Sequence, residues 1–395
     1  MNKVESLYIN EIGVCNPLGA NKCEVAEHLF AGWQGGLVAR QDLLLDGDIY
    51  VGQVTTELPD LSKFGKHFHS RNNQLVLLAY LQIEDAVNEL KLQVSAERIG
   101  VIIGTSTSGI AQGEQAMQHR FSDAEFPDNY DYRVQELSNP AEFISEYAGL
   151  KGFVTVISTA CSSSAKSFIT AAEMISAGLL DAAIVGGVDS LCGMTVNGFS
   201  ALASTSAGIC NPSSVNRDGI NIGEAAALAV VSRQKSAIKL LAGGESSDAH
   251  HMSAPHPEGL GAKEAMQQAL SNASLSAQDI DYINLHGTAT PKNDEMEAIA
   301  VSSLFPSKPF VSSTKGSVGH TLGAAGATEL AFCYLSLQYQ KLPLHLWDAV
   351  QDPAMPVLNW VTDDSQIQSK LQHCLSNSFA FGGNNVSLII GLEHE

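Results

Sequence analysis

Hydrophobic residues form short, unbroken runs in the first half of the chain, and each run ends in small or polar residues. Runs of this length, rich in Val and Ile, are typical of buried β-strands. The strands predicted in this way cover residues 6–13, 98–104, 154–158, 182–188 and 225–232. Between them, apolar residues recur at three- and four-residue spacing, which predicts helices over residues 21–31, 72–91 and 165–178. Strands that alternate with helices indicate an α/β fold.

The same order of strands and helices begins again near residue 236. Strands are expected at 238–242, 280–286, 309–313 and 386–391, and helices at 262–272, 294–304 and from about 320 to 340. Two short matches link the halves. Residues 156–162 (Val-Ile-Ser-Thr-Ala-Cys-Ser) resemble 311–317 (Val-Ser-Ser-Thr-Lys-Gly-Ser), and 104–107 resemble 287–290. We therefore predict two duplicated halves, residues 1–235 and 236–395, each with a mixed, mainly parallel sheet covered by helices.

Three segments interrupt this pattern. Residues 40–70 are irregular, residues 110–150 are more polar and aromatic and leave the core, and residues 190–223 are rich in Gly, Ser and Asn and are expected to form a loop.

The composition narrows the function. The chain of 395 residues carries a net charge of −20, which argues against general nucleic-acid binding because phosphate contacts need clustered Lys and Arg. Its seven cysteines are scattered without a Cys-x-x-Cys pair, so neither a disulfide framework nor a zinc site is expected. The N-terminus has no signal-peptide pattern, and no apolar run reaches the length of a membrane span. We expect a soluble, cytoplasmic protein.

Cys161 stands at the turn between a predicted strand and a predicted helix. The helix N-terminus favours a thiolate there, and free backbone N–H groups can hold an oxyanion. A lone cysteine in such a position is more often structural. Three further residues, His286, Lys315 and His320, also follow predicted strand ends on small-residue turns. Sites in such sheets form at the carboxyl ends of strands, so the four residues predict nucleophilic catalysis by a thiol with two imidazoles nearby.

The motifs around these residues resemble the β-ketoacyl-ACP synthases of the elongating, Cys-His-His type, where ACP is acyl carrier protein. The motifs are Ser-Thr-Ala-Cys (158–161), Asn-Leu-His-Gly-Thr-Ala-Thr-Pro (284–291), Ser-Thr-Lys-Gly-Ser-Val-Gly-His (313–320) and Asn-Ser-Phe-Ala-Phe-Gly-Gly-Asn-Asn (377–385). The resemblance covers essentially the whole chain. It implies the thiolase fold, in which two duplicated halves form a five-layered α/β/α/β/α core, and it implies decarboxylative condensation of an acyl thioester with malonyl-ACP to give 3-oxoacyl-ACP.

The resemblance also assigns roles. Cys161 would carry the acyl group, and its N–H and that of Phe381 would form the oxyanion hole, with Phe381 also acting as a gate. His286 and His320 would act on malonyl-ACP during loss of carbon dioxide. Lys315 would hold His320, with Glu329 as its partner.

Further residues match positions that bind ligands in the family. The resemblance assigns Thr288, Thr290 and Phe379 to substrate binding, with the two threonines on the phosphopantetheine arm of ACP. It assigns no firm metal site, but relates four residues to a monovalent cation found in some members: Asn284, Glu329, Ser376 and Asn377. No tightly bound cofactor is implied.

Partners and pathway are less closely defined. The resemblance implies ACP and either a homodimer or a heterodimer with a related condensing-enzyme-like subunit. For ACP docking we expect Lys63, Lys66 and Arg71, which are rare bases in an acidic chain. Chain length is left open, as is the choice between fatty-acid and polyene or polyketide elongation. The alternatives are a CoA-dependent thiolase-type enzyme and a non-catalytic chain-length-factor-like subunit.

Overall fold

The computed structural model describes residues 6–365, 367 and 369–393. Its core is an eleven-stranded sheet, with the order β12-β11-β10-β13-β14-β9-β1-β8-β6-β4-β5. The strands of the first half are β1 (Leu7–Cys15), β4 (Ile99–Gly104), β5 (Val154–Ile157), β6 (Ala182–Asp189) and β8 (Ala225–Ser232). Those of the second half are β9 (Ile238–Ser247), β10 (Tyr282–Asn284), β11 (Phe310–Ser312), β12 (Asn359–Trp360), β13 (His373–Phe379) and β14 (Asn384–Leu392).

The strand order is itself duplicated. In the first half β5-β4-β6-β8-β1 follow one another, and in the second half β11-β10-β13-β14-β9 do so with the same sequence of parallel and antiparallel pairings. The strands that carry the site run parallel to one another within each half: β4, β5 and β6 in the first, and β10, β11 and β13 in the second. The two strands next to the junction pair antiparallel in each half, β8 with β1 and β14 with β9. The two expected sheets form one, because β1 pairs with β9 over Leu7 to Ile9.

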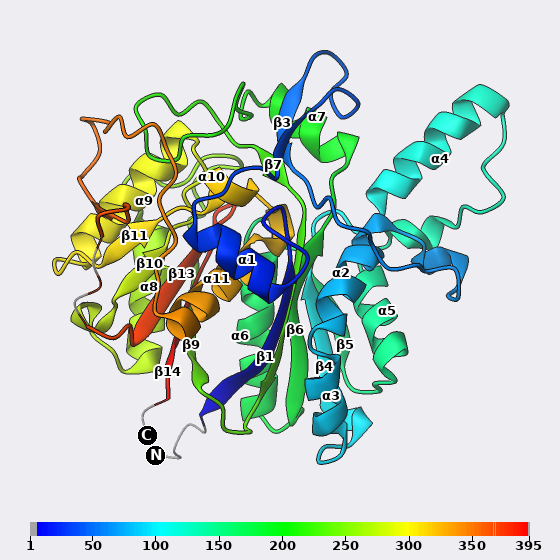
Figure 1. Cartoon of the computed structure of the whole chain (residues 1–395), viewed down its shortest axis with the longest axis horizontal. Coiled ribbons are helices and arrows are strands. Elements are labelled where there is room, and N and C mark those ends of the chain that lie inside the picture. The colour runs from blue at the N-terminus through cyan, green and yellow to red at the C-terminus, as the bar shows by residue number, and fades with distance from the viewer. Residues whose placement is uncertain (1–5, 366, 368, 394–395) are drawn as a thin grey trace.

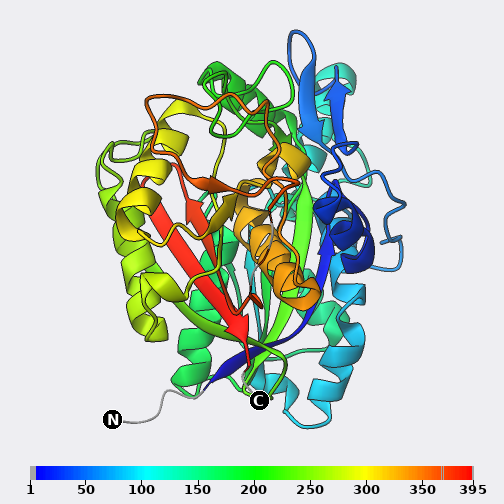
Figure 2. The same ribbon diagram turned by 60° about the vertical axis from the view of Figure 1, so that its left-hand side comes forward.

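Two central helices lie between the halves of the sheet (Figures 1 and 2). These are α6 (Ser163–Ser176) and α11 (Ala325–Tyr339), and each contacts strands of both halves. Helices α2 (Arg71–Leu81) and α5 (Asn139–Ala148) cover the outer face of the first half, and α8 (Leu260–Ala273) and α9 (Pro291–Leu304) cover that of the second. These five layers confirm the expected thiolase fold. The exact boundary of the halves at residue 235 stays a prediction.

The central helices meet at their N-terminal ends. A Cβ on Gly326 would lie 2.6 Å from Cβ of Ala165 and 2.7 Å from its backbone nitrogen, so only glycine permits this approach. The Ser164 hydroxyl accepts a hydrogen bond from the Ala327 N–H at 2.9 Å, which satisfies a donor in the first turn of α11. This contact brings the turn before α6 next to the turn before α11.

Local differences from the expected elements have identifiable causes. The helix expected over 72–91 is broken into α2 and α3 (Glu84–Lys91). Between them the Gln82 amide donates to the carbonyls of Val14 and Ala20 and so ties the break to the turn before α1 (Lys22–Phe30). Strand β13 was not expected, since its polar sequence His-Cys-Leu-Ser-Asn-Ser-Phe hides a buried strand.

The three irregular segments also contain regular structure. Residues 40–70 include β3 (Ile49–Gly52), which joins β2 (Leu37–Arg40) and β7 (Ile222–Gly223) in a small sheet. The loop expected at 190–223 contains α7 (Gly193–Ala201), and the excursion begins with α4 (Ile110–Asp123), which projects from the body of the molecule (Figure 1). In the described part of the chain, no helix has both the length and the apolar character needed to cross a membrane.

Candidate active site

The cysteine turn is tightly built. After β5 the chain turns at Ala160, whose φ of 53° lies in the left-handed region, and Cys161 follows directly before the first turn of α6. Ser163 stabilises the turn, because its hydroxyl donates to the Ala160 carbonyl and accepts from the Thr159 N–H. The thiol is buried, and the backbone N–H groups of Cys161 and Phe381 point at its sulfur. Two N–H donors at one sulfur are the arrangement expected of an oxyanion hole.

The expected thiolate is not the resting state of Cys161. Burial raises the pKa of this thiol to about 11, although the charge of Lys315 and the two N–H groups act in the opposite direction. Burial therefore outweighs the groups that favour the charged form, and Cys161 rests as a thiol in the free protein. The proton of the thiol must leave during the reaction.

Two imidazoles lie next to the thiol. Nε2 of His320 lies 2.9 Å from Sγ of Cys161, and the rings of His286 and His320 are 5.3 Å apart and nearly perpendicular. The sulfur and one ring nitrogen of each histidine all lie within 4.8 Å of one another. Burial and the charge of Lys315 hold the pKa of both histidines well below the usual range. Both imidazoles are therefore neutral near pH 7.

Lys315 fixes the tautomer of His286. Its ammonium is buried in α10 (Lys315–Val318) and lies 3.4 Å from Nδ1 of His286, and it also donates to the His286 carbonyl and to the carboxylate of Glu329. Since the ammonium can only donate, Nδ1 accepts and the proton of the neutral ring is on Nε2. The expected Lys315–Glu329 pair is present. Lys315, however, contacts His286 rather than His320.

Two buried carboxylates that the sequence analysis missed hold the backbone of the site. Glu297 on α9 accepts from the N–H groups of His286 and Gly287, each at 2.8 Å, and burial raises its pKa to about 7. Asp189 at the end of β6 accepts from Ser106, Thr107 and Ala324 N–H groups and thereby links turns of both halves. Acidic residues of this kind look like solvated residues in a sequence, although Asp189 directly follows a buried apolar strand.

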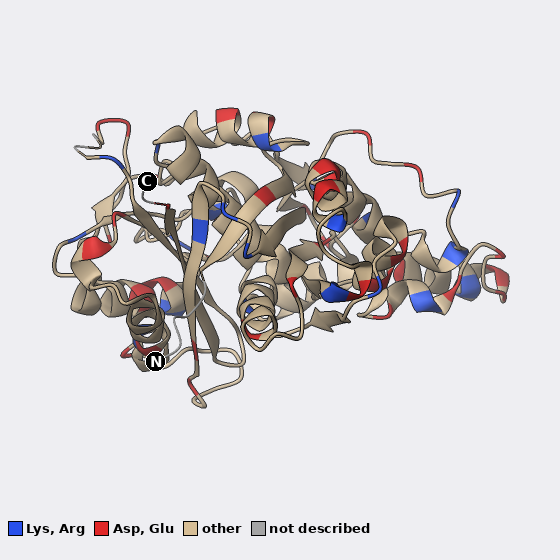
Figure 3. Ribbon diagram, turned by 90° about the horizontal axis from the view of Figure 1, so that it is seen from below, with Lys and Arg blue, Asp and Glu red and all other residues tan. Residues whose placement is uncertain are grey.

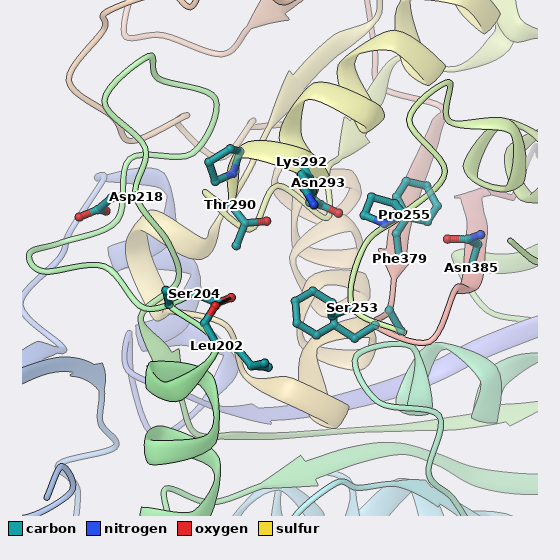
Figure 4. A pocket seen from close by; sticks show the side chains of 14 residues that line it. Leu202, Ser204, Asp218, Ser253, Pro255, Thr290, Lys292, Asn293, Phe379 and Asn385 are labelled. Carbon is teal, nitrogen blue, oxygen red and sulfur yellow. Dashed lines mark hydrogen bonds between the residues drawn. The ribbon is translucent and has the colours of Figure 1, made fainter. Parts of the chain in front are cut away.

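An entrance leads from the surface to the thiol. Its outer part is a cavity of about 210 Å³, and Figure 4 shows Thr290 and Lys292 on one side of it, with Pro255 and Phe379 beside them. A narrow inner part contains Cys161 and both histidines. Five residues line both parts: Ser204, Thr290, Asn293, Phe379 and Phe381. Thr288 lines the inner part, and its hydroxyl lies 2.8 Å from that of Thr290. The predicted substrate-binding residues therefore all line one passage.

Three of the four residues related to a monovalent cation have a side-chain oxygen free to bind one. Three buried oxygens have no hydrogen-bond partner among the described residues: Oδ1 of Asn284, Oε2 of Glu329 and Oγ of Ser376. Asn284 and Ser376 face each other in register on β10 and β13. Oxygen ligands left unpaired in the core suit a cation. Asn377 differs from these three, because its side-chain oxygen already accepts from Ser387 and its NH₂ donates to Glu297.

The predicted docking bases do not form a single free group. Lys63 is exposed, and Lys66 is exposed and donates to the Asp128 carbonyl. Arg71 is instead committed to a buried carboxylate, since its guanidinium donates twice to Glu224 and once to the Val54 carbonyl. The prediction of Arg71 as a docking residue was therefore wrong. Figure 3 shows that acidic and basic residues are mixed along the molecule, including the projecting end.

Comparisons with known proteins agree with this geometry. Residues 46–237 match the family model "Beta-ketoacyl synthase, N-terminal domain", and residues 238–346 match "Beta-ketoacyl synthase, C-terminal domain". The chain is 29% identical to 3-oxoacyl-[acyl-carrier-protein] synthase 2 of Staphylococcus aureus (strain COL), over 98% of this chain and 99% of that protein.

Solved structures give the same result. The ketosynthase ApeO of Xenorhabdus doucetiae, solved in complex with its chain length factor ApeC, is 42% identical with a TM-score of 0.95, covering 100% of this chain and 99% of that one. A β-ketoacyl synthase from Burkholderia phymatum STM815 is 26% identical with a TM-score of 0.87, covering 99% of this chain and 100% of that one. With both domain models matched and the Cys-His-His group assembled, the chain belongs to the β-ketoacyl synthase family of condensing enzymes.

Proposed function

We propose that this chain transfers an acyl group from ACP to Cys161 and condenses it with malonyl-ACP, which gives 3-oxoacyl-ACP and carbon dioxide. The observation that carries the proposal is the 2.9 Å contact between Sγ of Cys161 and Nε2 of His320, with a second neutral imidazole beside it. A nucleophile, a base and a second hydrogen-bond donor within one buried group are what this reaction requires.

In the first step the thiol loses its proton to Nε2 of His320 while the sulfur attacks the thioester carbonyl of acyl-ACP. The tetrahedral oxyanion accepts hydrogen bonds from the N–H groups of Cys161 and Phe381, which already point at the sulfur. The carbon–sulfur bond to the carrier then breaks, and the carrier thiol leaves with the proton from His320. The products are acyl-Cys161 and free ACP.

In the second step malonyl-ACP occupies the site of the departed carrier. Its thioester oxygen gains charge as the carboxylate leaves as carbon dioxide, and the Nε2–H of His286 donates to that oxygen. Once the thiol is acylated, the neutral ring of His320 can carry its proton on Nε2 rather than Nδ1, and in that tautomer it supplies the second donor. The enolate carbon attacks the acyl thioester, and a new carbon–carbon bond replaces the bond to Cys161. The Cys161 sulfur leaves as a thiolate, carrying the negative charge that the malonyl carboxylate brought, and takes a proton from solvent as the product departs.

The passage supports a substrate carried on a long, thin arm. The Thr288 and Thr290 hydroxyls line it next to Phe379, and such hydroxyls suit the amides of a phosphopantetheine arm. No tightly bound cofactor is needed for this chemistry. A monovalent cation held by Asn284, Glu329 and Ser376 would supply positive charge beside the Lys315–Glu329 pair. We also expect the protein to act in the cytoplasm.

A related condensing-enzyme-like subunit is the partner we propose. Strand β5 is the edge of the sheet, and its four residues are only partly buried. Unpaired strand edges are open to pairing with another chain. The projecting α4 segment adds exposed apolar side chains, among them Met117 and Phe121. Since the 42% identical ketosynthase is solved with a chain length factor, we propose a heterodimer of this kind rather than a homodimer.

Chain elongation of the polyene or polyketide type fits the same relative, although fatty-acid elongation uses the same chemistry. The two alternative functions fit the site less well. A non-catalytic subunit has no need of a complete Cys161, His286 and His320 group. A thiolase-type enzyme that uses a second cysteine would need one beside the first, but Cys161 is the one cysteine among the described residues that line the inner part of the passage.

The direct test incubates the purified protein, alone and after coexpression with its partner, with acyl-ACP and [2-13C]malonyl-ACP. We expect labelled 3-oxoacyl-ACP by mass spectrometry, and an acyl adduct on Cys161 when malonyl-ACP is omitted. Absence of both the adduct and the product, in every acyl chain tested, would reject the proposal. Product formed from CoA thioesters with no carrier present would instead favour the thiolase-type alternative.

A further inference from the structure

The turn that carries Phe381 has a second attachment to the cysteine turn besides the N–H that faces the sulfur. The Ser162 hydroxyl lies 3.3 Å from Oδ1 of Asn384, across 222 residues of sequence. Ser162 is completely buried and is the residue between Cys161 and α6. Asn384 begins β14, three residues after Phe381. Ser162, the residue after Cys161, therefore touches Asn384, the residue that follows the Phe381 turn.

The Ser162 side chain is fixed on the cysteine side. Its hydroxyl lies 2.8 Å from the Thr159 carbonyl and 3.0 Å from the Thr159 hydroxyl, so it cannot turn away without losing both contacts. The hydroxyl has one proton and two acceptor positions. It can donate to Thr159 and still accept from the Asn384 amide when the NH₂ of that amide faces it. Because the Thr159 carbonyl can only accept, the single proton of Ser162 goes to it, and the amide NH₂ is the donor in the contact with Asn384.

The Phe381 turn, by contrast, is placed by contacts with several segments of the chain. Gly382 and Gly383 have φ values of 90° and 82°. The Gly382 N–H donates to the Met252 carbonyl, the Gly383 carbonyl accepts from the Asp248 N–H, and the Phe381 ring lies 5.7 Å from that of Phe199. The turn is closed by backbone hydrogen bonds from Gly383 to Ala380 and from Ala380 to Asn384. Asn384 closes the turn on the side of β14, and its side chain is the attachment of the turn that reaches Ser162, so it helps to set where the Phe381 N–H lies.

We infer that Ser162 and Asn384 form a positioning pair that sets the Phe381 N–H relative to Cys161, and thus the geometry of the oxyanion hole. The inference rests on the proposed function, because it concerns the oxyanion of the acyl thioester on Cys161. Neither residue touches the reacting atoms; both act through the two turns. The pair also gives a role to the serine after Cys161, which the catalytic chemistry does not itself require.

If the Ser162–Asn384 pair positions the oxyanion hole, its loss should affect one of the two partial reactions and not the other. Acylation of Cys161 and attack on the acyl group both pass through the oxyanion at Cys161. Decarboxylation of malonyl-ACP passes instead through an enolate held by His286 and His320. Loss of the pair should therefore slow acylation and leave decarboxylation unchanged. A merely structural role would lower both rates together, because a loosened fold disturbs the whole site.

The test compares Ser162→Ala, Asn384→Ala and the double variant in the protein with its partner. Acylation is followed by quenched-flow intact mass with acyl-ACP, and decarboxylation by conversion of malonyl-ACP to acetyl-ACP. We expect each single variant to acylate about tenfold more slowly, below the loss for removal of a whole oxyanion donor. The double variant should be no slower than the slower single variant, since both remove one contact. Decarboxylation should stay within twofold of the unaltered protein.

Ser167→Ala is the matched control. Ser167 is a buried serine on the same helix, bonded to the Ser164 and Gly186 carbonyls and remote from the Phe381 turn. It should acylate at the unaltered rate. Normal acylation in both single variants, additive losses in the double variant, or a parallel fall in decarboxylation would each overturn the inference. If the unaltered protein neither acylates nor decarboxylates, the proposed function itself fails, and the two outcomes are thus distinct.

Discussion

The buried ammonium of Lys315 lies 3.4 Å from Nδ1 of His286 and donates at the same time to the carboxylate of Glu329. All three protons of the ammonium have acceptors, the third being the His286 carbonyl. One residue thus fixes the ring, its tautomer and the backbone that carries it. Burial lowers the pKa of both catalytic imidazoles, and the same positive charge lowers it further. Burial and the lysine together therefore keep both histidines neutral, so that they can act as hydrogen-bond donors.

Removal of Lys315 alone should be destabilising. Lys315→Met leaves the carboxylate of Glu329 buried without its partner, which costs about 3–5 kcal/mol. Since Glu329 has a raised pKa of about 7 even with the lysine present, it will take up a proton in the variant and recover part of that loss. The double variant Lys315→Met/Glu329→Leu should regain most of the stability but stay inactive. Urea unfolding and a condensation assay check both parts; an active double variant would contradict the role of Lys315.

Cys161 should react slowly with alkylating agents at neutral pH. Its pKa of about 11 means that the thiolate fraction rises tenfold for each pH unit below that value. We expect the rate of alkylation by iodoacetamide to rise about 100-fold between pH 7 and pH 9. Peptide mapping separates the product from that of the exposed Cys23. A rate that is constant over this range would show that the resting cysteine is already a thiolate.

The three central side chains should fail in different ways when each is replaced. Cys161→Ala abolishes condensation but leaves some decarboxylation of malonyl-ACP, because both histidines remain. His286→Ala should still accept an acyl group on Cys161 and then form no carbon–carbon bond. His320→Ala should acylate at least tenfold more slowly as well, since it removes the base 2.9 Å from the sulfur. Intact mass after incubation with acyl-ACP distinguishes these outcomes.

Of the three bases near residue 66, we expect Lys63 and Lys66 to contribute to ACP docking and Arg71 to contribute to stability. Charge reversal at the exposed Lys63 and Lys66 should raise the KM for ACP substrates severalfold at low salt and less at high salt. The exposed Lys341 provides the control, and Lys341→Glu should leave KM unchanged. Arg71→Ala should instead lower stability by about 3–5 kcal/mol, because Glu224 is completely buried. An unchanged KM in both lysine variants would exclude this surface.

His345 should make the fold less stable in mild acid. Its Nδ1 accepts from the Ser313 N–H and its Nε2 lies 3.1 Å from the Pro212 carbonyl, and burial lowers its pKa from 6.5 to about 3. Between these values the unfolded chain binds the proton and the folded protein does not, so stability is fully present above pH 6.5 and falls as the pH drops towards 3. This residue alone contributes up to about 1.4 kcal/mol per pH unit. Urea unfolding of His345→Gln between pH 7 and pH 5 should show a correspondingly shallower decline.

The sequence was sufficient for the duplicated fold and for the group around Cys161, because both depend on local patterns. Apolar strands and small-residue turns are visible along the chain, and the motifs place Cys161, His286 and His320 at strand ends. What the sequence could not show depends on burial or on distant partners. The pKa of Cys161 follows from desolvation, and the commitment of Arg71 follows from a carboxylate 153 residues away. Strand β13 was hidden because three consecutive residues in it, Ser376, Asn377 and Ser378, are polar although they are buried.

The close approach of Gly326 to Ala165 has a consequence for how the enzyme can diversify. The turns before the two central helices carry the nucleophile and its base, and their spacing is fixed where one backbone rests on the other. The reactive distance is thus insulated from the walls of the entrance, which come from other loops. Proteins with this fold can therefore differ in the residues that line the entrance, and so in the acyl chains that they admit, without a change in the catalytic chemistry. The substitution Gly326→Ala would place a methyl group against Ala165, force the two helices apart and change the distance between the nucleophile and its base.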